Sequence, residues 1–195
     1  MVQKKKRNSK SDNKAKILKS AIRLIGENGV EGTSLSDIAK DVGISKGTLY
    51  YYYSTKSDIV FDITDVHMTK ITANIFDLIE KNKGDVSWKE MLKILFTTLL
   101  KSETRTRLHI YLIREILSGN EKLREQFQAT YLNWFRMVEE GYLMITGDKQ
   151  DISGEARSLV AVLDGYVIQA IIGMGDVNVE ETVEKLSRII DEQVG

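Results

Sequence analysis

The residues best suited to chemistry lie close together in one short stretch of the chain. From Ser45 to Lys56 the sequence reads Ser-Lys-Gly-Thr-Leu-Tyr-Tyr-Tyr-Tyr-Ser-Thr-Lys, which brings lysines, a threonine and phenols side by side. So many hydrogen-bond donors on a short helix are poorly suited to a hydrophobic core. They are well suited to contacts with base edges and phosphates in the major groove of DNA.

The surrounding residues predict the elements that would position these side chains. Apolar residues recur on one helical face over residues 35–42. Gly43 then supplies a turn, in a backbone conformation that is costly for other residues. Ser45 is expected to cap a second helix over residues 46–52. The stretch therefore predicts two short helices joined by a glycine turn, which is the pattern of a helix-turn-helix.

Composition restricts the class of protein. The 195 residues are 42% hydrophobic and 29% charged, as in an ordinary globular protein. There is no cysteine, which excludes disulfides, thiolate zinc sites and cysteine nucleophiles. The net charge is zero, but residues 1–60 hold 12 Lys and Arg against 6 Asp and Glu, whereas residues 61–195 hold 16 against 22. The positive potential that attracts phosphates therefore lies on the first 60 residues.

The fold class follows from helical periodicity, the absence of proline and the scarcity of strand patterns. We expect an all-α fold of about nine helices, in which a three-helix DNA-binding domain precedes a helical C-terminal domain. The expected parts are a basic flexible tail at 1–11, the DNA-binding domain at 12–55 and the C-terminal domain at 56–195. The expected helices span residues 12–28, 35–42, 46–52, 56–82, 87–101, 104–117, 121–146, 152–173 and 179–193.

Residues 158–174 are apolar on nearly every face, which raises the question of a membrane span. Asp164 and Gln169 argue against one, and a helix of this kind is expected to be buried on all sides. Residues 8–14 are polar where a signal peptide would be apolar. We therefore expect no membrane partner and a cytoplasmic location.

The last two expected helices carry more apolar surface than one small domain needs. This excess predicts that two copies of the chain associate as a homodimer through a four-helix bundle. Some of these residues are expected to face the core of their own subunit instead. The candidate seam residues are Leu159, Val162, Leu163, Tyr166, Val167, Ala170, Val183, Leu186 and Ile190.

The first 60 residues resemble the TetR (tetracycline-repressor-like) family of bacterial regulators. The order, spacing and glycine placement of the family pattern all agree with this stretch, whereas the later helices match the family only in number and length. The residues that carry the resemblance are Ile17, Ala21, Leu24, Gly29, Thr33, Ser34, Ile38, Ala39, the run from Val42 to Tyr50, and Lys56.

The resemblance implies that the helix at 46–52 enters the major groove of double-stranded DNA. Lys46 and the backbone of Gly47 would meet base edges, while hydroxyl groups and Lys56 would bind phosphates. The implied DNA contacts are Ser34, Ser36, Lys46, Gly47, Thr48, Tyr50, Tyr51, Tyr52 and Lys56. Roles other than DNA contact remain open for three of these residues. Ser34 could serve simply as a helix cap, Tyr50 could pack against the protein, and Lys46 could be an ordinary surface lysine.

The resemblance also implies that residues 56–195 form an effector-binding and dimerisation domain with a pocket for a small molecule. Taken together, the large, adaptable side chains in this region suit an apolar or amphipathic effector, although for each of them alone plain core is the simpler role. The candidate pocket residues are Phe76, Trp88, Phe96, His109, Tyr111, Phe127, Tyr131, Trp134 and Phe135.

Catalytic functions are poorly supported. The sequence contains no phosphate-binding glycine loop, no His-Glu-x-x-His and no nucleophile elbow, so we expect no enzyme, no cofactor and no metal. Two functions remain open. One is a ligand-responsive regulator, most simply a repressor released from a palindromic operator by its effector. The other is a DNA-binding factor of the same fold whose C-terminal domain binds another protein, without an inducer.

Overall fold

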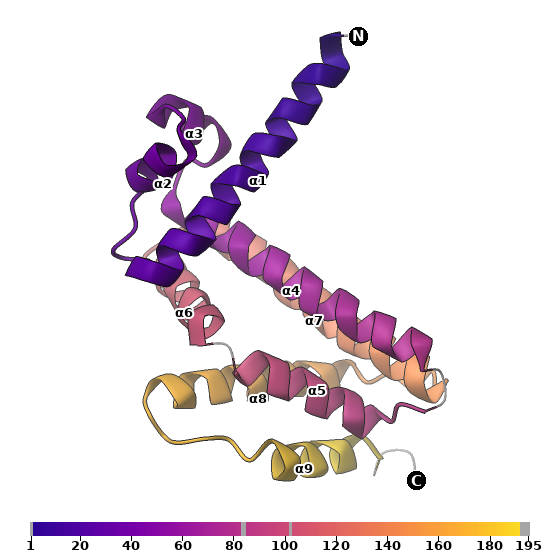
Figure 1. Ribbon diagram of the computed structural model, residues 1–195. Helices are drawn as coiled ribbons and strands as arrows, with labels where there is room; N and C mark the ends of the chain where they lie inside the picture. The colour runs from indigo at the N-terminus through magenta and orange to yellow at the C-terminus, as the bar shows by residue number, and fades with distance from the viewer. Residues whose placement is uncertain (1, 83–84, 102, 192–195) are drawn as a thin grey trace. The chain divides into compact units, whose positions relative to one another are not determined.

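The protein is all-helical over the residues that the structure, a computed structural model, describes, namely 2–82, 85–101 and 103–191. Figure 1 shows the helices in chain order. They are α1 (Val2–Asn28), α2 (Leu35–Val42), α3 (Lys46–Tyr52), α4 (Lys56–Lys81), α5 (Trp88–Leu100), α6 (Glu103–Leu117), α7 (Glu121–Thr146), α8 (Ser153–Ile171) and α9 (Val179–Asp191).

These bounds confirm the predicted all-α fold and agree with the predicted helices within two residues, with one exception. Helix α1 begins at Val2, whereas the sequence predicted a start at Asp12 after a flexible tail. The run of residues 2–11 lacks proline and glycine, so nothing in it interrupts a helix. The side chains of residues 2–11 lie outside the described part of the chain, and so does the prediction that the basic tail touches DNA.

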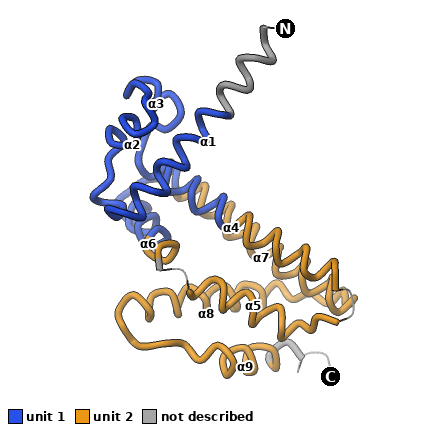
Figure 2. The backbone as a smooth tube through the Cα atoms, in the orientation of Figure 1, with its two compact units in different colours: residues 1–67, 108–123 blue, residues 68–107, 124–195 orange. Residues whose placement is uncertain are grey.

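The chain divides into two compact units, which Figure 2 shows in different colours. Unit 1 comprises residues 1–67 and 108–123, and unit 2 comprises residues 68–107 and 124–195. The expected DNA-binding domain at 12–55 lies within unit 1. That unit also includes the first part of α4 and most of α6, which the sequence had assigned to the C-terminal domain.

Unit 1 is built around apolar side chains from α1, α2, α3 and the start of α4. Ile17, Ile38 and Leu49 have no exposed surface, and they come from three different helices. The apolar faces predicted for α2 and α3 are therefore buried against each other, as a helix-turn-helix requires. Thr33 is also buried, and its hydroxyl donates to the carbonyl oxygens of Leu24 and Gly29, which fixes the turn between α1 and α2.

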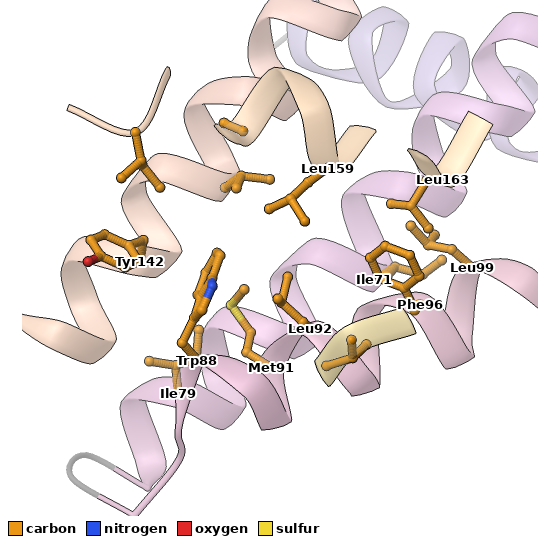
Figure 3. Close-up of a cluster of buried hydrophobic side chains, with 14 of the residues drawn as sticks. Ile71, Ile79, Trp88, Met91, Leu92, Phe96, Leu99, Tyr142, Leu159 and Leu163 are labelled. Atoms are coloured by element: carbon orange, nitrogen blue, oxygen red, sulfur yellow. The ribbon is translucent and has the colours of Figure 1, made fainter. Parts of the chain in front are cut away.

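Unit 2 has the larger hydrophobic cluster, to which α5 contributes more buried side chains than any other helix. Figure 3 shows Trp88, Met91, Leu92 and Phe96 of α5 inside this cluster. The ring of Trp88 meets that of Tyr142 edge-on, with centroids 5.3 Å apart. Helix α5 contacts both α8 and α9, and ion pairs from Lys89 and Lys93 to glutamates of α9 border the contact. No helix among the described residues is long and apolar enough to cross a membrane.

Candidate nucleic-acid interface

Helix α2 begins with a reciprocal pair of hydrogen bonds. The Ser34 hydroxyl accepts from the backbone N–H of Asp37, and the Asp37 carboxylate accepts from the Ser34 N–H at 2.9 Å and from its hydroxyl at 2.6 Å. The Ser34 hydroxyl and its N–H keep the pKa of Asp37 below its ordinary value. Ser34 is therefore a helix cap, as the plainer alternative held, and its exposed position leaves the predicted phosphate contact open.

The turn between the two short helices has the geometry that the sequence predicted. Gly43 has φ of 75°, in the left-handed region that favours glycine. The N–H of Ile44 bonds to the carbonyl of Ala39 at 3.0 Å, and that of Gly43 bonds to the carbonyl of Lys40 at 3.2 Å. These two hydrogen bonds end α2 and fix the direction in which α3 begins.

Helix α3 presents polar side chains to solvent. Ser45 caps it, because its hydroxyl accepts from the Thr48 N–H at 3.0 Å. Tyr50 is 53% exposed and Tyr51 is 70% exposed, so neither is mainly a packing residue. The ring of Tyr51 meets that of Tyr52 edge-on at 5.4 Å. Lys46 is exposed as well, whereas Thr48 and Ser36 are half-buried.

Gly47 is the most informative residue of α3, because nothing within the protein requires a glycine there. Its φ is not positive, and an added methyl group would meet only the Ser45 hydroxyl, at an ordinary contact distance of 3.8 Å. A glycine in a helix costs about 0.5–1 kcal/mol relative to alanine. A close approach by a molecule outside the chain would account for it.

Two side chains near the end of α3 differ in their surroundings. Tyr53 is buried, as expected for core, and its hydroxyl donates to Asp62 at 2.8 Å. Burial and the neighbouring Asp62 carboxylate raise the pKa of Tyr53. Lys56 differs from its prediction as a phosphate clamp. Its ammonium donates to the Val30 carbonyl at 2.8 Å and lies 3.6 Å from the Glu31 carboxylate, so it is engaged within the protein.

The nine residues predicted to line an effector pocket are divided between the two units. His109 and Tyr111 are buried in unit 1, whereas the other seven belong to unit 2. Trp88 and Phe96 are part of the unit 2 core, and Phe76 is half-buried. The remaining four form one aromatic cluster along α7, where the ring of Tyr131 lies within 6.2 Å of each of its neighbours Phe127, Trp134 and Phe135.

The sequence did not reveal a polar group beside this aromatic cluster. The Tyr131 hydroxyl donates to the Asp164 carboxylate at 2.8 Å, and desolvation followed by the Asp164 charge raises the pKa of Tyr131. Arg105 is also buried, and desolvation lowers its pKa to about 10, partly offset by Asp164. Asp164 and Arg105 are distant in sequence, and no local spacing links them.

Two surface cavities lie within unit 2, each of about 430 Å³. One lies between α8 and α9 and is bordered by Val162, Tyr166 and Leu186. The other lies between α7 and the start of α8, where Arg157 stacks on the ring of Phe135 at 4.9 Å. Of the predicted pocket residues, only Phe135 lines either cavity. Among the described residues, no group of three His, Asp or Glu side chains could hold a metal ion.

The candidate dimer seam includes both buried and partly exposed residues, and the sequence analysis allowed for some that face their own subunit's core. Leu159, Leu163, Val167 and Val183 are buried by the helices of their own unit, so they offer no surface to a second copy. Val162, Tyr166 and Leu186 are half-buried against the same core, whereas Ala170 is exposed. The side chain of Ile190 lies outside the described residues. Other large apolar side chains, which are not among the seam candidates, are exposed at the end of α8 and just after it: Ile168, Ile171, Ile172 and Met174.

The fold and the exposed α3 together define a helix-turn-helix protein with a helical C-terminal domain. Residues 17–63 match the model of the tetR family of bacterial regulatory proteins. The chain is 32% identical over 126 residues to an HTH-type transcriptional regulator of Staphylococcus aureus, an alignment that covers 64% of each chain. It is 34% identical over 110 residues to IcaR, the biofilm operon negative transcriptional regulator of the same species, covering 55% of this chain and 58% of IcaR.

The chain thus aligns with less than two-thirds of the length of these two relatives. Solved structures extend the likeness of fold over nearly the whole chain. Thermus thermophilus FadR, a transcriptional repressor solved with lauroyl-CoA, superposes with a TM-score of 0.68 and 21% identity, covering 90% of this chain and 92% of FadR. Residues 17–63 therefore match the DNA-binding region of the TetR family, and the chain as a whole is similar in fold to a TetR-family repressor. Its relatives are named as regulators, which confirms the expectation that it is not an enzyme.

Proposed function

We propose that this chain is a cytoplasmic transcriptional repressor that binds a palindromic operator as a homodimer and is released by a small apolar or amphipathic effector. The observation that best supports the DNA contact is Gly47. A glycine that the protein itself does not need stands on the exposed face of α3, beside Lys46 and ahead of Tyr50 and Tyr51. Such a face lets the backbone approach base edges while the neighbouring side chains bind bases and phosphates.

The exposed end of α8 supports the homodimer. Ile168 and Ile172 lie on one face of the helix, and Ala161 and Gly165 continue that face toward its beginning. Small residues followed by isoleucines allow two helices to pack closely, and exposed apolar surface of this kind marks an association site. In such a dimer, the two helix-turn-helix regions would be related by a two-fold axis and would bind half-sites about 34–36 Å apart or at a multiple of that spacing.

The aromatic cluster on α7 supports an effector with an apolar body. Tyr131 and its three aromatic neighbours provide a large, rigid apolar surface next to the Asp164 carboxylate. FadR, which is similar in fold, was solved with lauroyl-CoA, a ligand with an apolar chain and a polar head. An effector of this chain releases DNA only if it binds the free protein more tightly than the DNA-bound protein.

The proposal is tested by DNA binding and by ligand screening on the same preparation. The purified protein should bind a fragment from upstream of its own gene, and Lys46→Ala should relax base preference at one position in each half-site, worth about 1–3 kcal/mol. A thermal-shift screen of lipophilic cations, fatty acyl compounds and aromatic drugs should identify one class that stabilises the protein and releases the fragment. Stabilisation without release would favour a factor that has no inducer.

A further inference from the structure

A polar cluster in unit 1 joins the helix-turn-helix to α6, and the sequence did not predict it. We call it the Glu31 cluster, and it consists of Glu31, Lys56, Tyr111 and Arg114. Glu31 accepts from Arg114 at 2.6 Å and lies 3.6 Å from the Lys56 ammonium. The ring of Tyr111 lies beneath both cations, 5.0 Å from the Arg114 guanidinium and 5.9 Å from the Lys56 ammonium. The Arg114 hydrogen bond is the main reason that the pKa of Glu31 lies below its ordinary value.

The position of this cluster along the chain gives it a mechanical role. Glu31 lies in the turn three residues before Ser34, the cap of α2, and Lys56 is the first residue of α4, just after α3 ends. The cluster therefore holds both ends of the α2–α3 segment. The Lys56 bond to the Val30 carbonyl ties these two ends directly to each other.

Neighbouring contacts attach α6 and the start of α7 to the same end of α4. Ser57 is buried, and its hydroxyl donates to Glu115 at 2.9 Å. Lys122 donates to Asp58 at 2.6 Å, and Asp58 also accepts from the Ser54 hydroxyl and the Thr55 N–H. Helix α6 thus contacts the entrance of the α2–α3 segment through Arg114 and its exit through Glu115 and Tyr111.

We propose that Glu31 and Arg114 are positioning residues for the DNA-binding α2–α3 segment, and that they link operator binding to the local stability of α6. The inference rests on the DNA-binding function proposed above. The side chains of Glu31 and Arg114 are both exposed, and exposed ion pairs add little to global stability, so this pair acts by fixing geometry. Because linkage is reciprocal, operator binding should change the local stability of α6, and removing the pair should remove that effect.

The experiment compares the full-length protein with Arg114→Gln, Glu31→Gln and the double variant. Hydrogen exchange in residues 108–117 is followed with and without a duplex from upstream of the protein's own gene. Lys185→Gln is a matched control, because Lys185 forms an exposed ion pair with Glu181 in α9 of unit 2. In the unmodified protein and in the control, the duplex should slow exchange in this segment.

In Arg114→Gln and Glu31→Gln the duplex should bind about two- to thirtyfold more weakly and should leave exchange in α6 unchanged, while the melting temperature stays close to that of the unmodified protein. The double variant should bind no more weakly than the worse single variant, because both changes break the same contact. Preserved DNA-induced protection of α6 in the single variants, or losses that add in the double variant, would overturn the inference. Failure of the unmodified protein to bind any upstream duplex would instead refute the proposed function, before any variant is compared.

Discussion

Replacing Gly47 by alanine should change protein stability and DNA affinity in opposite directions. The added methyl group has room, since its nearest neighbour is the Ser45 hydroxyl at 3.8 Å, and the backbone needs no glycine. Alanine is favoured over glycine inside helices by about 0.8–1.0 kcal/mol. Because Gly47 lies in the first turn of α3, we expect about half of that gain, or roughly 1–2 °C in melting temperature for a chain of this size.

The same methyl group should weaken DNA binding, because it would lie between the α3 backbone and the base edges. Holding α3 away from the groove should cost at least one base contact per half-site, about 1–3 kcal/mol. At about 1.4 kcal/mol for each factor of ten, the expected loss in operator affinity is about fivefold to one hundredfold per half-site. Fluorescence anisotropy with a labelled operator duplex measures the affinity, and thermal unfolding measures the stability.

Gly26→Ala is the matched control for this experiment. Gly26 is an exposed glycine in α1, and a methyl group there would meet nothing within 4 Å. This variant should be slightly stabilised and should bind the operator like the unmodified protein. Unchanged operator affinity in Gly47→Ala would refute the close approach of α3 to DNA. A lower melting temperature for Gly47→Ala would refute the local geometry from which the argument starts.

Two further predictions concern stability and assembly. Burial alone would raise the pKa of Asp58, but hydrogen bonds from Lys122, Ser54 and Thr55 outweigh it and hold the pKa below the ordinary value of 3.8. The ionised Asp58 therefore stabilises the protein above about pH 4, and this stabilisation is lost as the pH falls through the pKa of Asp58 in the folded protein. Because Lys122→Met removes one of these hydrogen bonds, its free energy of unfolding, measured with urea, should fall less on acidification than that of the unmodified protein. Ile168→Glu combined with Ile172→Glu should convert a dimer to a monomer in analytical ultracentrifugation, whereas Leu117→Glu, at an 82% exposed position in unit 1, should not. A dimer that survives both α8 changes would show that this face is not the seam.

The helix-turn-helix could be predicted closely because its signals are local. Gly43 ends α2, Ser45 caps α3, and the apolar spacing of residues 35–42 selects the buried face within one element. Each of these signals depends on neighbours only a few residues away. The bounds of α2 and α3 therefore follow from the sequence without knowledge of the rest of the chain.

The exposed face of α8 could not be predicted in the same way. That helix is apolar on nearly every side, so periodicity does not show which of Leu159, Leu163 and Ile168 the unit buries for itself. Which of these side chains are buried depends on α5 and α9, which contact α8 and come from other parts of the chain. The engagement of Lys56 with Val30 and Glu31 was missed for the same reason, because those partners are remote in sequence.

The most direct test of the central claim is the stoichiometry and salt dependence of operator binding. A fragment protected by the protein upstream of its own gene should contain two inverted half-sites, and the complex should hold two copies of the chain on that duplex. The affinity should fall steeply as salt rises, because each phosphate contact releases a counterion. A protein that remains a single subunit and binds no upstream fragment even at low salt would contradict the account.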